Sequence, residues 1–259
     1  MSELSLTPGR LRGQTAVITG AASGLGAATA RRFVAEGARV VAVDRSGEAL
    51  SNLVTELGEA VHPLCADVSS EGEMEAMAGE ALKILGDVDV VFANAGIEGV
   101  GRADSCPVDQ WATVLAVNLT GVFLTSRFLL PAMIARGSGS IVNTASVAAL
   151  VGVPNILPYT AAKGGVAAMT RQMAVDLSPQ GIRVNAICPG TVMTPLVTRN
   201  WEAKGLTPKE ALAGSLGNYP LRRTGEPADI AALVAFLSCS DSGWITGAVI
   251  PIDGGYTAR

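Results

Sequence analysis

The sequence predicts an α/β protein in which helices cover both faces of one parallel sheet. Short apolar runs recur along the 259 residues, and segments of helical length separate them. Continuous apolar runs are typical of strands that are buried on both faces. Because strand and helix patterns alternate, each strand is expected to run parallel to its neighbours. No linker or change in composition divides the chain, so residues 1–259 are expected to form a single domain.

Seven apolar runs are the candidate strands, and the run at residues 60–65 is the weakest of them. The strands are expected at Ala16–Ile18, Val40–Val43, Ala60–Cys65, Val88–Phe92, Ile141–Val142, Val184–Ile187 and Val249–Ile252. Helical patterns lie between them at Gly24–Glu36, Glu71–Leu85, Pro107–Arg136, Tyr159–Ser178 and Pro227–Ser238.

The composition argues against several classes of function. The net charge is −4 and the sequence pI is about 5.1, whereas a nucleic-acid-binding surface usually needs a basic face. The chain has a single histidine, His62, and its four cysteines form no CxxC pair, so we expect no metal site. Residues 1–12 lack a long apolar core, so they resemble neither a signal peptide nor a membrane span. We expect a cytoplasmic protein that binds neither nucleic acid nor a membrane.

A glycine-rich turn, Thr19–Gly26, lies between the first candidate strand and the first helix. Gly20 allows a tight turn, Gly24 allows the backbone to approach a pyrophosphate, and Gly26 allows the helix to pack on the strand. The N-terminus of the helix adds unpaired N–H groups and the positive end of a dipole. These features predict a dinucleotide-binding site, although a glycine cluster by itself is also compatible with an ordinary tight turn.

Asp44 ends the second candidate strand, where an acidic residue accepts hydrogen bonds from the ribose hydroxyls of a dinucleotide. A carboxylate at this position repels a 2′-phosphate, which favours NAD over NADP. The following Arg45 is able to pair with such a phosphate and argues in the other direction. Asp44 is also compatible with an acid that only stabilises the turn after the strand.

Tyr159 and Lys163 are four residues apart, so they project from one helix face. A phenol titrates near pH ~10 and is a weak acid–base catalyst at neutrality. An ammonium about 4 Å away stabilises the phenolate by roughly 4 kcal/mol at an effective dielectric of about 20, equivalent to up to roughly three pKa units. We therefore expect Lys163 to lower the pKa of Tyr159 toward working pH. Ser146 supplies a hydroxyl for a carbonyl oxygen, or alternatively only a cap at a strand end.

Seven sequence elements occur in one order along nearly the whole chain. They are Thr19-Gly20-x3-Gly24-x-Gly26, Asp67-Val68, Asn94-Ala95-Gly96, Asn118, Ser146, Tyr159-x3-Lys163 and Pro189-Gly190. With these elements the chain resembles the short-chain dehydrogenase/reductase family. The resemblance implies a Rossmann-type, doubly wound sheet of seven parallel strands with helices on both faces. One departure is Ala93, where family members often carry an asparagine.

The resemblance also implies residue roles. Lys163 is implied to tune Tyr159 and to hold the nicotinamide ribose, and Asn118 to anchor a water beside Lys163, unless Asn118 is only a core amide. The implied catalytic set is Asn118, Ser146, Tyr159 and Lys163. The implied cofactor-binding set is Gly20, Ser23, Gly24, Leu25, Gly26, Asp44, Arg45, Asp67, Val68, Asn94, Ala95, Gly96, Tyr159, Lys163, Pro189, Gly190, Val192 and Thr194.

Residues 191–224 differ in composition from the rest of the chain. They contain several prolines and glycines and follow a strand end, where α/β proteins bind ligands. We expect a mobile substrate-binding lid here, in preference to an ordinary pair of surface helices. The expected substrate-binding residues contain no arginine or lysine, which favours a neutral, largely apolar substrate of small to medium size. They are Ser146, Ala148, Val153, Leu157, Tyr159, Met193, Leu196 and Trp201.

The sequence thus predicts an NAD(H)-dependent oxidoreductase that interconverts a secondary alcohol and a ketone, with Tyr159 as general acid/base. An NADPH-dependent 3-oxoacyl-thioester reductase is the first alternative, and Asp44 argues against it. A non-catalytic nucleotide-sensing protein is the second, and the complete catalytic set argues against that. The helices expected at 107–136 and 159–178 carry surplus apolar and small residues. By resemblance such helices pair between subunits, which implies a homotetramer, or else a dimer.

Overall fold

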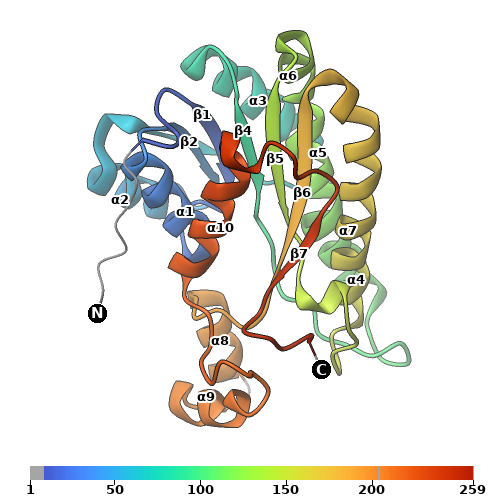
Figure 1. Cartoon of the computed structure of the whole chain (residues 1–259). Coiled ribbons are helices and arrows are strands. Elements are labelled where there is room, and N and C mark those ends of the chain that lie inside the picture. Colours follow the sequence, from blue (N-terminus) through green and yellow to red (C-terminus); the bar gives the residue numbers. More distant parts are fainter. Residues whose placement is uncertain (1–8, 204, 259) are drawn as a thin grey trace.

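The computed structural model describes residues 9–203 and 205–258, which are built around one seven-stranded sheet (Figure 1). The strand order is β3-β2-β1-β4-β5-β6-β7, and every neighbouring pair is parallel. This confirms the predicted doubly wound sheet of seven parallel strands. Residues 1–8, on which part of the expectation about the N-terminus rests, lie outside the described residues.

All seven apolar runs form strands, including the weak run at residues 60–65. Successive side chains of a strand point to opposite faces of the sheet. In β1, Ala16 and Ile18 therefore face one layer of helices and Val17 faces the other, and all three are fully buried. The strands are β1 (Thr15–Thr19), β2 (Arg39–Asp44), β3 (Val61–Cys65), β4 (Val90–Ala93), β5 (Gly139–Thr144), β6 (Ile182–Pro189) and β7 (Val249–Ile252).

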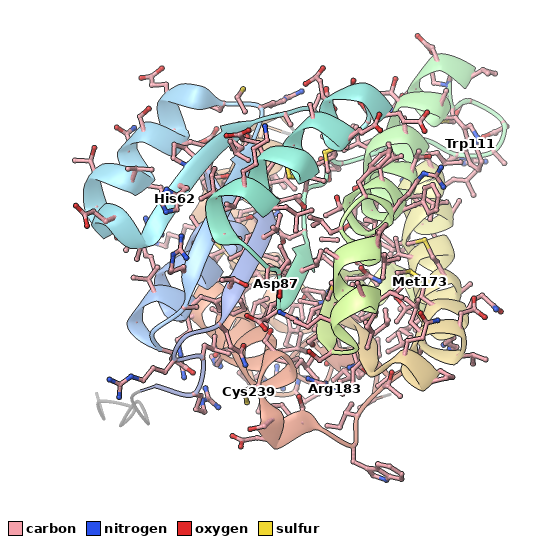
Figure 2. All side chains as sticks on the ribbon, turned by 90° about the horizontal axis from the view of Figure 1, so that it is seen from above. His62, Asp87, Trp111, Met173, Arg183 and Cys239 are labelled. Carbon is pink, nitrogen blue, oxygen red and sulfur yellow. The ribbon has the colours of Figure 1, made fainter. Side chains whose placement is uncertain are left out.

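Helices cover the sheet in two layers, and apolar side chains fill the space between each layer and the sheet (Figure 2). Arg183 of β6 ties the sheet to the end of one helix, because its Nη2 donates to the Leu237 carbonyl oxygen at 2.8 Å. On the face reached by Ile18 lie α1 (Gly24–Ala35), α2 (Gly47–Leu57) and α10 (Pro227–Ser238). On the face reached by Val17 lie α3 (Glu71–Leu85), α5 (Gly121–Arg127), α6 (Leu130–Arg136) and α7 (Leu157–Leu177).

The pattern at residues 107–136 does not form the one continuous helix that was predicted. It forms α4 (Val108–Leu115), a π-helical turn (Ala116–Thr120), α5 and, after a break at residues 128–129, α6. Pro131 explains the break, because proline lacks an N–H and its ring clashes with the preceding turn. Among the described residues no single helix is long and apolar enough to cross a membrane. Residues 108–127 and 130–136, bent by 40°, pass that test only as a pair, as the core helices of soluble proteins also do.

Residues 191–224 contain two helices, α8 (Pro195–Ala203) and α9 (Pro208–Leu216), which extend beyond the carboxyl end of the sheet (Figure 1). The two ends of this segment are tied together. Tyr219 Oη donates to Thr191 Oγ1 at 2.7 Å and accepts a hydrogen bond from the Thr191 N–H at 3.1 Å. The two ends of the segment therefore lie together, next to the end of β6. Its mobility stays a prediction.

A buried carboxylate joins the N-terminal segment to α1. The Glu36 side chain is fully buried and accepts hydrogen bonds from Arg10 Nη2 at 2.7 Å and from Arg32 Nε. Burial alone would raise the pKa of Glu36, but the hydrogen bonds from both arginines outweigh it and hold the pKa below its ordinary value of 4.5. Because the folded-state pKa is depressed, this carboxylate stabilises the fold above the unfolded-state pKa. The contribution is lost as the pH falls through the folded-state pKa.

Replacing Glu36 by Gln is expected to lower the free energy of unfolding at pH 7 by about 1.5–3 kcal/mol, because charge-assisted hydrogen bonds are lost. Denaturant titration measures this, and the difference from wild type should shrink as the pH falls below 4.5. The control is Glu56→Gln, which removes the half-exposed partner of Arg31 and should cost about 0–1 kcal/mol. Equal stability of wild type and Glu36→Gln at pH 7 would contradict this interpretation of the network.

Candidate active site

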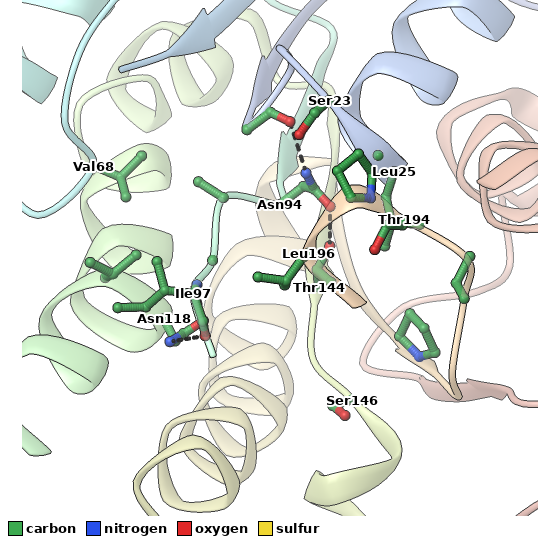
Figure 3. Close-up of a pocket in the computed structure, with 18 of the residues that line it drawn as sticks. Ser23, Leu25, Val68, Asn94, Ile97, Asn118, Thr144, Ser146, Thr194 and Leu196 are labelled. Atoms are coloured by element: carbon green, nitrogen blue, oxygen red, sulfur yellow. Dashed lines mark hydrogen bonds between the residues drawn. The ribbon is translucent and has the colours of Figure 1, made fainter. Parts of the chain in front are cut away.

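A cavity of about 420 Å³ lies at the carboxyl end of the sheet. It opens between β1 and β4, the point at which the strand order reverses and at which α/β proteins bind ligands. Its walls come from the turns after β1, β2, β3, β4, β5 and β6, from the π-helical turn, and from the starts of α7 and α8. Figure 3 shows side chains from these separate elements converging on the cavity.

The turn between β1 and α1 requires glycine at three positions. Gly20 has a φ of +65°, and a Cβ built on it would lie 2.9 Å from Asn94 Nδ2. Gly24 has a φ of +53°, and its Cβ would lie 3.3 Å from the Thr194 side chain. At Gly26 a Cβ would lie only 2.1 Å from the Gly20 carbonyl oxygen. The missing side chains therefore create a backbone-lined cradle at the start of α1.

The start of α1 leaves backbone N–H groups available in this cradle. Ser23 precedes the helix, and its side chain makes no capping hydrogen bond. No acidic residue lies in the first helical turn. Unpaired N–H groups and the positive end of the helix dipole together favour an anion at this place. The residues present therefore fit the pyrophosphate of a nicotinamide dinucleotide.

Asp44 lines the cavity beside Arg45, and it also stabilises its own turn. Its Oδ2 accepts a hydrogen bond from the Ala22 N–H at 3.1 Å, and its Oδ1 accepts one from the Ser46 N–H at 3.1 Å. The turn-stabilising interpretation is therefore correct. It does not compete with the predicted ribose contact, because a carboxylate has about four acceptor positions.

Asn118 is fully buried in the π-helical turn, and backbone groups hold its amide. Its Oδ1 accepts from the Ile97 N–H at 3.2 Å, and its Nδ2 donates to the carbonyl oxygens of Ile97 at 3.0 Å and Val114 at 3.1 Å (Figure 3). A Cβ on Gly96 would lie 2.7 Å from Asn118 Oδ1 and 3.7 Å from Lys163 Nζ. Asn118 is thus the backbone-bonded amide considered above, and it also lines the cavity.

Lys163 of α7 is 2% exposed and lies at the base of the cavity. Its Nζ donates to the Thr144 carbonyl oxygen at 2.7 Å and lies 5.6 Å from the centroid of the Tyr159 ring. Burial lowers the pKa of Lys163 to about 8, because an ammonium loses its hydration there. An ammonium has three donors, and within the described part of the chain one of them is used. The other two are available to a ligand in the cavity.

The pKa of Tyr159 departs from its ordinary value in the direction opposite to the prediction. Burial raises this pKa above 10.0, hydrogen bonding with Ser146 opposes the rise, and the negative charge of Glu98 adds to it. The expected stabilisation by Lys163 does not prevail, because the same burial that disfavours the phenolate also disfavours the ammonium. Tyr159 is therefore protonated at neutral pH.

Ser146 follows β5 and precedes a short 3₁₀ turn, Val147–Ala149. Its Oγ accepts a hydrogen bond from the Ala148 N–H at 3.1 Å, so it caps this turn. A hydroxyl that accepts one hydrogen bond still has its own hydrogen to donate. Figure 3 shows the Ser146 side chain among the residues that line the cavity, so the hydroxyl is able to donate to a ligand there.

The cavity brings most of the predicted residues together. The four catalytic candidates line it, and so do the cofactor candidates apart from Gly26, which packs against the Gly20 carbonyl. Three of the substrate candidates line it, namely Ser146, Tyr159 and Leu196. The others do not: Ala148 is buried, Met193 borders a shallow neighbouring hollow, and Val153, Leu157 and Trp201 lie outside the lining.

Two residues that the sequence analysis did not single out are important in the cavity. Thr144 holds Lys163 through its carbonyl oxygen, and its place at a strand end is a sequence signal for such a position. Arg199 also lines the cavity, although it is not among the substrate residues predicted from the sequence. Arg199 follows Leu196 by three residues on α8, and this spacing puts both on one helix face. That spacing is the signal that could have identified it.

Comparison with known proteins identifies the family. Residues 20–257 match the family described as enoyl-(acyl carrier protein) reductase. The chain is 42% identical over 229 residues to the inactive 2-(S)-hydroxypropyl-CoM dehydrogenase 2 of Xanthobacter autotrophicus, covering 88% of this chain and 99% of that protein. It is 40% identical over 265 residues to levodione reductase of Leifsonia aquatica, covering 100% and 99%. A crystal structure of levodione reductase matches with a TM-score of 0.92 at 40% identity, covering 96% and 99%.

The chain therefore belongs to the short-chain dehydrogenase/reductase family of oxidoreductases, as the sequence motifs indicate.

Replacing Gly96 by Ala is expected to lower the free energy of unfolding by about 1–3 kcal/mol, because the new methyl group overpacks the contact with Asn118 Oδ1. Gly164→Ala is the matched control, since Gly164 follows Lys163 on α7 and has nothing within 4 Å of its Cβ position. That change should stabilise the protein by about 0.5–1 kcal/mol. Thermal or denaturant unfolding of both variants gives the comparison. Stabilisation in both would show that Gly96 is not packed as described.

Proposed function

We propose that the protein is an NAD(H)-dependent oxidoreductase that interconverts a secondary alcohol and a ketone on a small to medium, largely apolar substrate. The observation that carries the proposal is that Ser146, Tyr159 and Lys163 line the same cavity as the glycine turn. A proton-transferring hydroxyl and a dinucleotide cradle thus share one space. Hydride transfer between a cofactor and a carbonyl carbon requires this arrangement.

A bound nicotinamide dinucleotide would supply or accept the hydride, and the side chains of the cavity act on the substrate oxygen. Ser146 Oγ–H donates a hydrogen bond to this oxygen as negative charge develops on it. Tyr159 is protonated at neutral pH, which suits delivery of a proton during ketone reduction. In the reverse direction its phenolate removes the alcohol proton, and because the pKa of Tyr159 is raised, this phenolate forms at alkaline pH. Lys163 lines the cavity and is held in place by the Thr144 carbonyl, and its two other donors serve the ribose of the cofactor.

The proposed cofactor is NAD in preference to NADP. Asp44 presents a carboxylate to the cavity at the end of β2, and its anchoring by the Ala22 and Ser46 N–H groups fixes its position. A fixed negative charge disfavours a 2′-phosphate more strongly than a mobile one, because the side chain has no low-energy way to turn aside. Arg45 also lines the cavity, and within residues 9–203 and 205–258 no hydrogen bond anchors its long side chain.

The substrate is proposed to be a ketone or secondary alcohol with little charge. Ile97, Val192, Leu196 and Val197 give the cavity an apolar wall near the proton-transferring hydroxyls. The related levodione reductase supports a ketone as the class of substrate. Residues 191–224 are proposed as the substrate-binding lid, since the start of α8 forms part of this wall.

Two other functions are weaker candidates. A relative named 3-oxoacyl-(acyl-carrier-protein) reductase, 38% identical over 249 residues, supports an NADPH-dependent 3-oxoacyl-thioester reductase, and the carboxylate of Asp44 argues against it. One relative is named as inactive, and this name supports the alternative of a non-catalytic nucleotide-sensing protein. The presence of Asn118, Ser146, Tyr159 and Lys163 in one cavity argues against that alternative.

We also propose a cytoplasmic homotetramer whose ligands are small molecules. Apolar side chains on the helices expected to pair between subunits are strongly exposed, among them Val108 at 81% and Val175 at 73%. Exposed apolar surface of this kind marks protein interfaces. Light scattering that reports a monomer at working concentration would contradict the assembly.

Replacing Tyr159 by Phe is expected to reduce ketone turnover by at least about 10²-fold, because the general acid/base is removed. Binding of NADH should persist, since the ring and the glycine turn remain. The measurement is nicotinamide absorbance with a panel of ketones and both cofactors, alongside an NADH binding titration. Tyr256→Phe makes the same change outside the cavity lining and should keep full turnover. Retained turnover in Tyr159→Phe would remove this residue from the mechanism, and no turnover by wild type on any ketone would favour the nucleotide-sensing function.

Replacing Asp44 by Asn is expected to shift cofactor preference toward NADPH, because the charge that repels a 2′-phosphate is lost. The ratio of kcat/KM for NADPH to that for NADH should rise about tenfold, equivalent to about 1.4 kcal/mol. Asp67→Asn is the matched control, since Asp67 lines the same cavity and should affect both cofactors alike. An unchanged ratio in Asp44→Asn, or a wild-type preference for NADPH, would overturn the assignment of NAD.

A further inference from the structure

Arg199 is a basic side chain of α8 that lines the main cavity and also the shallow hollow beside it. Several other arginines of this protein are paired with carboxylates, for example Arg10, Arg31 and Arg223. Arg199 is exposed, and no hydrogen bond or ion pair with another residue of the described ranges holds its guanidinium. A guanidinium at the wall of a cavity that no other described residue pairs with is available to an anionic ligand.

The position of α8 sets this side chain beside the cradle. Arg199 follows Leu196 by three residues, so the two side chains share the helix face that lines the cavity. Thr194, immediately before α8, lies against the glycine turn, since a Cβ on Gly24 would be 3.3 Å from its methyl group. The Thr194 hydroxyl accepts from the Val197 N–H at 3.4 Å, which holds the first turn of α8 at that place. The helix that bears Arg199 therefore begins at the edge of the cradle.

The charges around the cavity divide it into two ends. The carboxylates of Asp44 and Asp67 line the end at β2 and β3, where Arg45 is the one basic side chain among the lining residues. The start of α1 has free N–H groups and no acidic residue in its first turn. Arg199 adds a full positive charge from α8. A guanidinium presents a planar set of donors that matches a phosphate through two hydrogen bonds.

We propose that Arg199 binds the pyrophosphate of the dinucleotide, so that the cofactor links the cradle of α1 to α8. The inference rests on the proposed function, because it needs a dinucleotide in the cavity. Its consequence is that cofactor binding holds α8, and with it the Leu196 wall, over the substrate end of the cavity. An anionic group on the substrate is the alternative partner for the Arg199 guanidinium. Titration with cofactor fragments that lack the substrate distinguishes the pyrophosphate from this alternative.

The test is a calorimetric titration of wild type, Arg199→Gln and Lys209→Gln with NADH, ADP-ribose and AMP. ADP-ribose contains the pyrophosphate without the nicotinamide, and AMP contains a single phosphate. We expect Arg199→Gln to weaken NADH and ADP-ribose binding about tenfold, as for loss of a charge-assisted hydrogen bond, and to leave AMP binding nearly unchanged. Lys209 on α9 lines neither cavity, so Lys209→Gln should bind all three like wild type.

Two further measurements make the result specific to charge and geometry. The affinity difference between wild type and Arg199→Gln should shrink as salt is added, because salt screens the exposed guanidinium. Arg199→Lys keeps the charge but not the planar donor set, so its affinity for ADP-ribose should lie between those of wild type and Arg199→Gln. Circular dichroism and thermal unfolding establish that each variant is folded.

The outcomes separate this inference from the proposed function. If wild type binds NADH and ADP-ribose and Arg199→Gln binds them equally well, the inference alone is overturned. If that variant instead raises only the KM of a ketone that carries an anionic group, Arg199 belongs to substrate recognition and the inference is likewise overturned. If wild type binds neither NADH nor NADPH, the proposed function is overturned, and the inference with it.

Discussion

The hydrogen bond from Lys163 Nζ to the Thr144 carbonyl oxygen sets the chemistry of the cavity. Burying an ammonium costs free energy unless it is hydrogen-bonded, and here the end of strand β5 receives it through a neutral group. The charge is therefore held in place but only partly stabilised, which is why the pKa of Lys163 falls to about 8. Tyr159 beside it keeps its proton for the same reason. Burial, more than ion pairing, determines the protonation of this site.

The π-helical turn at Ala116–Thr120 is the second element that positions the site. A single π turn changes the direction of side chains along a helix, and such turns are frequent at functional sites. Here it accompanies a fully buried Asn118 whose amide is bonded to Ile97 and Val114. The small size of Gly96 lets Asn118 and Lys163 approach the same stretch of backbone. The π-helical turn, the buried amide of Asn118 and the absence of a side chain at Gly96 thus together set the position of Asn118 next to Lys163.

Local sequence patterns were enough to predict most of the fold and most of the residues around the glycine turn. Strands buried on both faces have an unambiguous apolar pattern, and the glycines at 20, 24 and 26 are needed by the backbone itself. The features that sequence reasoning missed depend on tertiary environment. The break before α6 and the π turn interrupt a pattern that is continuous in sequence. The raised pKa of Tyr159 and the place of Arg199 both follow from burial and helix direction, which residue spacing does not fix.

The substrate side was less predictable because residues 191–224 form a separate unit on the carboxyl end of the sheet. The two ends of this unit are joined by the hydrogen bonds between Tyr219 and Thr191. In addition, the Leu221 N–H donates to the Gly254 carbonyl oxygen at 3.2 Å. These contacts fix the base of the unit, whereas α8 and α9 extend from it. The wall that α8 adds to the cavity is therefore placed by tertiary contacts at the base of this unit and not by a strand of the sheet. Residue types alone therefore predict the glycine cradle well. They predict less well which side chains line the wall formed by α8.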